Sequence, residues 1–365
     1  MSGGPAFGWL GSLAGLRGVA ILLVLAFHLG LPVAGGGSVG VTAFFVLSGF
    51  LITSLLVAES TATGSVDLTS FYRRRIRRLF PALFATVGVV TLIALVAGQL
   101  EAITLDSILA ITYVANWARA TGQLMGVWNH TWSLAIEEQF YLVWPLAFVA
   151  LRRLAPATSL RVIATLLGIA IASAIWRIIL NANAASDARV YFGSDTRAEA
   201  LLAGCALACA VARWPSVRIP RWAGTAALLT LLAVAANPNI AAPWPGAMYS
   251  IATAATCLVI IAGLRPGRQW LGLDTRPMKW LGERSYSLYL WHVPVILFLG
   301  APMGQLAPAV RIGALAMFSL ALAILSYELV ERPLRRPRTA ACGVAPVIHD
   351  PVGGRLVRIR ARLAG

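Results

Sequence analysis

The chain has 365 residues, of which 59% are apolar and only 12% are charged, and its mean hydropathy is +0.78. Soluble globular proteins carry about 25% charged residues, so this composition excludes an ordinary soluble domain. The net charge of +16 would favour a nucleic-acid ligand in a soluble protein. In a membrane protein such a charge orients the loops, so we expect no nucleic-acid partner. The four cysteines show no metal-ligand spacing, and no metal is expected.

Apolar segments recur along the chain at the length that crosses a hydrocarbon core, which takes roughly 20 helical residues. They predict an all-α, polytopic transmembrane bundle of about ten spans. A short apolar piece near 105–118 is too short to cross comfortably, so it is predicted to be re-entrant or interfacial. The predicted spans are about 12–31, 39–58, 80–98, 132–151, 161–180, 197–213, 222–237, 246–264, 281–300 and 308–330.

Lys and Arg residues predict how these spans are oriented. If the N-terminus is cytoplasmic, 24 of the 30 fall in inner loops or in the tail, as in other inner-membrane proteins. We therefore expect a multi-pass protein of the cell (inner) membrane with both termini in the cytoplasm. Residues 1–337 are predicted to form the transmembrane domain, and residues 338–365 a basic tail that is disordered or associated with lipid.

The first predicted span contains two ionisable residues, Arg17 and His28. Eleven residues of helix bring them about 20° apart on one stripe, with a rise of about 16 Å between them. Ionisable groups inside a membrane are costly, which makes the pair a functional hypothesis. The alternative is an arginine that snorkels to the interface and a hydrogen-bonded core histidine.

The segment HTWSLAIEEQF, residues 130–140, places Glu137 and Glu138 at the mouth of another span. Adjacent helical residues face different ways, so only one of the two can face the bundle interior. A first-turn carboxylate behind a Ser133 or Thr131 cap is the structural alternative. Beside an intramembrane histidine, a glutamate is also a candidate to orient a general base.

Five arginines lie in FYRRRIRRLFP, residues 71–81, on the predicted inner face. They form either an anchor for anionic membrane lipids or a pocket for a phosphate-rich cytosolic ligand. The span before them holds Gly40, Ser48 and Gly49, small residues that let helices approach closely. Near the end of the chain, Tyr286, Tyr289 and His292 are spaced i, i+3 and i+6, and His292 could equally be a structural hydrogen-bonding residue.

Seven segments, in this order along the chain, together resemble acyltransferase family 3. The family consists of membrane O-acyltransferases that modify sugars of the bacterial envelope and some antibiotics. The resemblance runs from about residue 11 to residue 336. It rests on SLAGLRGVAILLVLAFH, GVTAFFVLSGFLI, FYRRRIRRLFPAL, HTWSLAIEEQFYLVWP, DTRAEALLAG, ERSYSLYLWHVPV and SYELVERPLRR.

The resemblance assigns roles to individual residues. The family's Arg-x10-His motif falls on Arg17 and His28, and with Glu137 these are the expected catalytic residues. The Arg-x-x-Arg motif falls on Arg75 and Arg78, which with the neighbouring Arg74 are expected to bind the donor. The expected substrate-binding residues are Trp132, Ser133, Arg197, Tyr289 and His292. One position departs from the family: Thr42 stands where an Asp is usual.

The family relation implies an acyl-CoA donor, usually acetyl-CoA, and an acceptor hydroxyl on an envelope glycan or glycolipid. In this hypothesis His28, oriented by Glu137, is the general base. A soluble antibiotic such as a macrolide is an alternative acceptor. A transporter of a sugar, lipid or drug is the alternative from another class, although no internal repeat supports it. Membrane lipids are expected partners, and a homo-oligomer is possible.

Overall fold

The computed structural model describes residues 8–335 except 238, 240–245 and 265–269. The described residues form helices joined by turns, with no β-strand among them, which confirms the all-α prediction. The predicted basic tail, 338–365, lies outside the described residues. The main helices are α1 (Gly8–His28), α2 (Val39–Thr63), α3 (Leu68–Val96), α4 (Leu100–Ile111), α5 (Ala115–Ala120), α6 (Trp132–Leu154), α7 (Leu160–Ala182), α8 (Asp187–Phe192), α9 (Ser194–Arg213), α10 (Arg221–Ala236), α11 (Ala247–Gly263), α12 (Arg276–Glu283), α13 (Ser285–Gly300) and α14 (Pro308–Ser326).

Short elements complete the chain. Single 3₁₀ turns at Pro32–Ala34 and Asn129–Thr131 precede α2 and α6. A π-helical turn, Tyr327–Glu331, joins α14 to the last described helix, α15 (Arg332–Arg335).

A helix occupies each of the ten predicted spans. Six segments of the described chain are long and apolar enough to cross a membrane, and α10, α11 and α13 are shorter apolar helices. Helix α9 carries four charged residues, Asp195, Arg197, Glu199 and Arg213, which lowers its hydropathy. The membrane class is thus supported, while the number of crossings stays a prediction.

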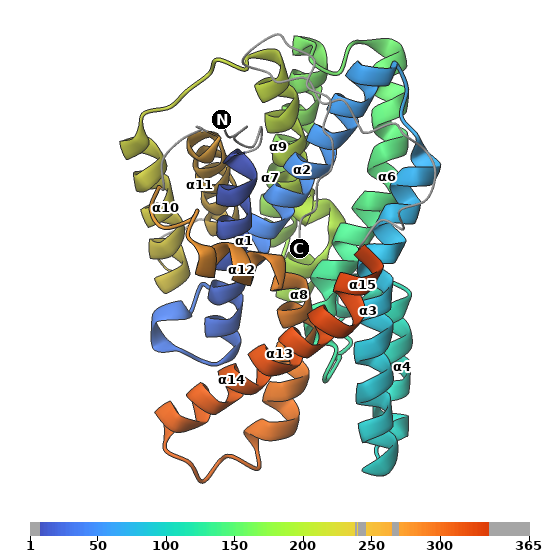
Figure 1. The fold of residues 1–365 in the computed structure, drawn as a ribbon, viewed down its shortest axis with the longest axis vertical. Coiled ribbons are helices and arrows are strands. Elements are labelled where there is room, and N and C mark those ends of the chain that lie inside the picture. The colour runs from blue at the N-terminus through green and yellow to red at the C-terminus, as the bar shows by residue number, and fades with distance from the viewer. Residues whose placement is uncertain (1–7, 238, 240–245, 265–269, 336–365) are drawn as a thin grey trace, which may run out of the picture.

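The helices pack as neighbouring pairs around a shared core (Figure 1). Helix α9 lies between α2 and α7, α1 packs on α12, α10 on α11, and α13 on α14. Close approach depends on glycine, as predicted for the second span. A Cβ atom on Gly49 would lie 2.0 Å from the Leu201 carbonyl oxygen, and one on Gly40 would lie 2.5 Å from that of Ala20. These contacts hold α2 directly against α9 and α1.

The third helix begins twelve residues before the predicted span 80–98. Asp67 caps it by accepting a hydrogen bond from the Ser70 backbone N–H. The arginine-rich segment therefore lies on the first turns of α3 and not in a loop. Helical spacing then divides the arginines: Arg75 and Arg78 are half-buried on one side, whereas Arg73, Arg74 and Arg77 are exposed.

The predicted short segment near 105–118 covers parts of two helices, α4 and α5. They are separated by a turn in which Tyr113 adopts a left-handed conformation, with φ of 56°. Figure 1 shows α4 running beside the far end of α3, and the two helices are in contact. Whether this hairpin enters the membrane stays a prediction.

Candidate active site

A cavity lies between α1, α2, α6 and α13, with about 350 Å³ of empty space that includes its opening to solvent. It brings together residues that the sequence analysis had selected from three separate segments. Arg17 comes from α1, Ser133 and Glu137 from α6, and Tyr289 from α13. The remaining lining residues are Val41, Phe44, Phe45, Leu134, Ser285 and Tyr286.

The Glu137 carboxylate is held by a chain of two hydrogen bonds. Ser48 donates to Glu137 Oε1 at 2.7 Å, and the Tyr141 hydroxyl donates to Ser48 Oγ at 2.8 Å. A carboxylate can only accept, so the donor direction along this chain is fixed. Thr131, the N-cap residue of α6, makes no side-chain cap bond, so Glu137 is held by tertiary contacts and not by a helix-start motif.

Three arginines surround the Glu137 carboxylate at the cavity wall. The Glu137 carboxylate interacts electrostatically with Arg17, Arg75 and Arg78. Arg75 also lies over the Tyr141 ring, 4.8 Å from its centroid, so the arginine pair and the Ser48 chain meet at one side chain. Arg74 points elsewhere: its side chain is 64% exposed and lies 3.9 Å from Glu59. Arg75 and Arg78 are therefore linked to the cavity through Glu137 and do not themselves line it, whereas Arg74 is not linked to Glu137.

Arg17 is fixed at the junction of α12 and α13. It donates to the Ser285 hydroxyl at 3.0 Å and to the Gly282 carbonyl at 3.3 Å. Its guanidinium group also lies 5.8 Å from the centroid of the Phe44 ring. These contacts hold Arg17 inside the protein at the cavity wall, in contrast to an arginine that snorkels to the membrane interface.

Three of the four histidines in the sequence gather beyond the cavity, at the other end of the polar stripe on α1. The His28 and His292 ring centroids are 4.8 Å apart, and those of His130 and His292 are 5.1 Å apart. His28 is half-buried, whereas His130 and His292 are 1% and 0% exposed. The fourth histidine, His349, lies outside the described residues. We call His28, His130 and His292 the histidine cluster.

Tyr289 connects the histidine cluster to the cavity. Its ring packs on His130 and His292, with centroids 5.4 Å away in each case. Its hydroxyl donates to the His130 carbonyl at 2.8 Å and lies 2.5 Å from Ser133 Oγ. Ser133 and Tyr289 therefore lie between the cavity and the histidine cluster.

The contacts of His28 fix which ring nitrogen can act as a base. Nδ1 lies 2.9 Å from the Val24 carbonyl, and a carbonyl can only accept, so Nδ1 carries the hydrogen. In the neutral ring Nε2 then holds the lone pair that a general base needs. The sequence analysis expected Glu137 to orient this ring. In the structure a backbone carbonyl of the same helix does so, and the Glu137 carboxylate bonds Ser48 instead.

Arg197 lies in a separate aromatic cage. The side chain is 3% exposed, and its guanidinium carbon is 4.0 Å from the centroid of the Tyr249 ring and 5.7 Å from that of Trp132. Arg197 Nη2 donates a hydrogen bond to the Thr42 hydroxyl at 3.1 Å, at the position where the sequence analysis noted that Asp is usual. Glu199 pairs with Arg177 at 2.8 Å. Among the described residues Arg197 therefore makes no ion pair within 4.0 Å, although it interacts electrostatically with Glu199.

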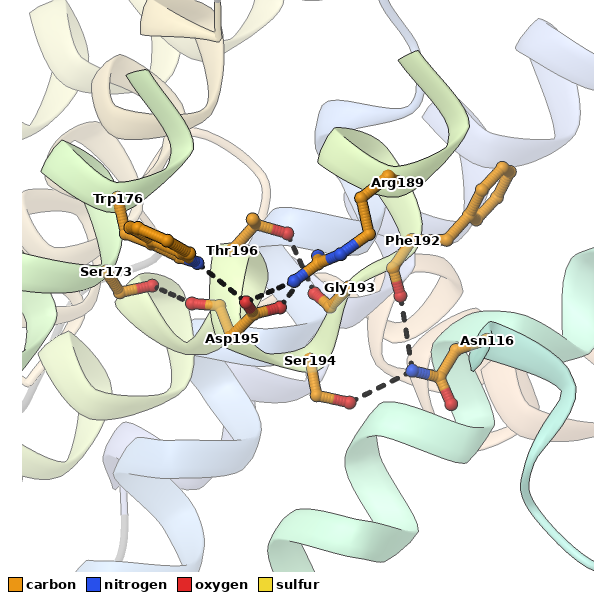
Figure 2. Close-up of polar contacts among 9 residues, drawn as sticks. All are labelled: Asn116, Ser173, Trp176, Arg189, Phe192, Gly193, Ser194, Asp195 and Thr196. Carbon is orange, nitrogen blue, oxygen red and sulfur yellow. Dashed lines mark hydrogen bonds and ion pairs between the residues drawn. The ribbon is translucent and has the colours of Figure 1, made fainter. Parts of the chain in front are cut away.

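A polar corner at the α8–α9 junction positions this cage (Figure 2). Asp195 accepts two hydrogen bonds from Arg189, at 3.0 and 2.6 Å, and one from the Trp176 indole at 2.8 Å. Asn116 of α5 donates to the Phe192 carbonyl at 3.2 Å and to Ser194 at 2.9 Å. These bonds lock the start of α9, and therefore Arg197, against α5 and α7.

Sequence reasoning missed three residues of the site. His130 was part of a selected motif but received no role. Ser48 was interpreted only as a small packing residue, and Tyr141 was not considered. A signal for His130 existed, because histidine is rare in this chain and His130 lies in the same segment as Ser133 and Glu137.

This cavity and histidine cluster, inside an apolar helical bundle, lie within a region that matches a known family. A model of the family described as "Acyltransferase domain" matches residues 10–328, nearly the whole described chain. The chain therefore belongs to this family of acyltransferase domains, as the sequence resemblance indicated.

Curated relatives narrow the similarity further. The chain is 35% identical to the O-acetyltransferase OatA of Staphylococcus aureus, with 93% of this chain and 59% of that protein aligned. It is 33% identical to the peptidoglycan O-acetyltransferase OatA of Listeria monocytogenes, with 89% and 56% aligned. It is 34% identical to the putative peptidoglycan O-acetyltransferase YrhL of Bacillus subtilis. The chain thus spans less than two thirds of these relatives. No solved structure matches it.

Proposed function

We propose that this chain is a membrane-embedded O-acyltransferase that acts on a cell-envelope glycan, with peptidoglycan as the first acceptor to test. The expected donor is an acyl-CoA, acetyl-CoA in the simplest case. Family membership and the names of the relatives support the reaction class. The relatives' names also favour a glycan acceptor over an antibiotic, and acyl transfer over transport.

The observation that carries the proposal is the joining of two compartments at Tyr289. The first is the cavity, which is lined by Arg17 and Glu137, and Arg75 and Arg78 interact electrostatically with Glu137. Guanidinium groups suit the phosphates of a CoA donor. The other is the histidine cluster, where His28 Nε2 is free to take a proton. This arrangement suits donor binding on one side and acceptor activation on the other.

The reaction can be written from these groups. The acceptor hydroxyl attacks the thioester carbonyl and forms a new C–O bond while His28 Nε2 removes its proton. The C–S bond then breaks, and CoA leaves as the thiol after it receives a proton. Arg75 and Arg78 hold the donor phosphates and Arg17 lines the route of the acyl arm. Holding both reactants in one geometry supplies a further part of the rate enhancement.

The direct test is mass spectrometry of envelope glycans and lipids from cells that carry the gene, lack it, or carry His28→Ala at equal expression. We expect an acyl group on a glycan hydroxyl in the first strain only. The appearance of an acylated lipid or drug, with an unchanged glycan, would move the proposal to another acceptor. Identical glycans in all three strains would contradict the proposed reaction.

The proposal includes an orientation in which the donor enters from the cytoplasm. Reporter fusions after residues 75 and 217 are then expected to read cytoplasmic, and a fusion near residue 186 extracytoplasmic. A fusion after residue 338 tests the predicted cytoplasmic C-terminus. An outer location for residue 75 would contradict an inner CoA site, since the arginines of α3 would face the wrong compartment.

A further inference from the structure

The histidine cluster contains more unpaired ring nitrogens than a structural role explains. Neither Nδ1 nor Nε2 of His130 meets strict hydrogen-bond geometry with a partner among the described residues, and the ring makes at most a weak hydrogen bond with the Leu290 backbone. Nε2 of His292 has no partner either. Both rings are almost fully buried. Buried polar groups are nearly always paired, so two such rings in contact require an explanation.

The backbone contacts define what these nitrogens offer. His292 Nδ1 lies 2.7 Å from the Tyr289 carbonyl and 3.2 Å from that of Leu288, so Nδ1 carries the hydrogen and Nε2 the lone pair. The same reasoning leaves a lone pair on His28 Nε2. His130, as a neutral ring, contributes one N–H donor and one lone pair. The cluster therefore offers one donor and three acceptors.

A hydroxyl group is the complement of this set, because it donates one hydrogen bond and accepts others. A carboxylate or phosphate could only accept, and would meet three lone pairs. A cationic group would find no carboxylate among the described groups that face His130, which are Trp128, His28, Tyr289 and His292. The chemistry thus selects a neutral, hydroxyl-bearing ligand.

We propose that His130 and His292, together with His28, form the binding site for the acceptor hydroxyl. This inference rests on the proposed function, which it deepens by naming the residues that recognise the acceptor. The acceptor hydroxyl donates to His28 Nε2, and the His130 N–H donates to the oxygen of the acceptor. His292 Nε2 is an alternative acceptor for the same proton, since the His28 and His292 ring centroids are 4.8 Å apart. The Tyr289 hydroxyl donates a hydrogen bond to the His130 backbone carbonyl and so holds His130 in place.

The proposal predicts opposite effects on stability and on acceptor binding. His130→Phe keeps a flat ring but removes both unpaired nitrogens, which is expected to leave the melting temperature unchanged or higher. The same variant should weaken acceptor binding about tenfold, since a hydrogen bond is lost in a buried site. His130→Gln retains a donor and an acceptor and should recover part of the binding. A residue kept for packing alone would show no such split.

The experiment uses the purified full chain in detergent and measures binding of two soluble peptidoglycan fragments. One carries the free hydroxyl that accepts the acyl group in the reaction, and the other has a hydrogen atom in place of that hydroxyl. Wild type should favour the hydroxylated fragment, His130→Phe should bind both alike, and His130→Gln should lie between them. The wild-type preference persisting in His130→Phe would overturn the proposal. A lower melting temperature with that preference intact would assign the cluster to a resident water only, and would overturn it as well.

Binding separates this inference from the proposed function. If wild type binds the hydroxylated fragment through His130 but transfers no acyl group from acetyl-CoA, the hydroxyl site stands and the donor or the reaction is wrong. If acyl transfer occurs and the His130 variants bind both fragments as wild type does, the reaction stands and this inference fails.

Discussion

The cavity and the histidine cluster are neighbours that share Tyr289, yet they treat their polar groups differently. In the cavity the polar side chains satisfy one another: Glu137 is bonded by Ser48, and Arg17 by Ser285 and Gly282. In the histidine cluster, His130 and His292 keep nitrogens without partners. The polar groups of the cavity already hold one another in place, whereas the histidine cluster retains ring nitrogens that can still form hydrogen bonds.

This difference matters because an unpaired buried polar group costs stability, whereas a paired one does not. A protein retains such groups where a ligand can pair them. Preorganised groups in the cavity suit a donor that is held in place. Unpaired imidazoles suit a group that must form and break bonds with protons. We therefore propose the histidine cluster as the site of proton transfer, and the following variants test this proposal.

The largest effect is expected from His28→Ala. General-base catalysis contributes roughly 10²–10⁴-fold, so acyl transfer should fall by that amount or more. The measurement is the rate of transfer from radiolabelled acetyl-CoA to peptidoglycan fragments by purified protein. Donor binding and the melting temperature serve as controls for folding. If His28→Ala keeps most of its activity, His28 is not the base. If His292→Ala loses as much activity as His28→Ala, the choice of His28 over His292 as the base is unsupported.

Removing the Ser48 hydrogen bond tests whether the polar contacts within the cavity matter. A hydrogen bond to a charged group is worth about 1.5–3 kcal/mol, so Ser48→Ala is expected to lower kcat roughly tenfold or more. Ser48→Thr retains the hydroxyl and should be milder. Because the bond acts through Glu137, Ser48→Ala should add little in a Glu137→Gln background. Glu138→Gln is the matched control at the neighbouring position. If the losses of Ser48→Ala and Glu137→Gln add in the double variant, Ser48 does not act through Glu137.

The arginine pair is expected to affect donor affinity alone. Arg75→Ala or Arg78→Ala should raise the KM for acetyl-CoA several-fold with little change in kcat, because phosphate contacts bind ground and transition states alike. Arg74→Ala is the matched control from the exposed side of α3 and should behave as wild type. If all three variants have the wild-type KM for acetyl-CoA, the arginines do not bind the donor and are better explained as an anchor for anionic membrane lipids.

The sequence predicted the helices because their apolar lengths are a local property, and helical spacing placed Arg17 and His28 on one stripe. It could not predict the contacts that define the site. Ser48 and Glu137 are separated by 89 residues, and the His130 carbonyl and Tyr289 by 159. Such contacts depend on how whole helices pack against one another, and this packing cannot be read from the local pattern of a single sequence.

The orienting group of His28 shows a second limit. Sequence reasoning looked for a side-chain carboxylate, because conspicuous residue types attract roles. The Val24 carbonyl that holds the ring is a backbone atom present at every position. Only the rotamer of His28 reveals it, and that rotamer depends on packing against His292.

The smallest effect is expected at Arg197, the third polar region, which resembles the histidine cluster in lacking a full set of partners. Two of its guanidinium nitrogens, Nε and Nη1, have no hydrogen-bond partner, and Thr42 supplies only a hydroxyl. Thr42→Asp places a carboxylate beside a cation that is already buried, so attraction is gained and only one further charge is desolvated. We expect a rise of a few degrees in melting temperature, roughly 1 kcal/mol, and unchanged acetyl-CoA KM. Thr42→Asn, which matches the shape without the charge, should show no rise. If Thr42→Asp melts lower than Thr42→Asn, the aromatic cage alone satisfies Arg197, and only the histidine cluster retains unused bonding capacity.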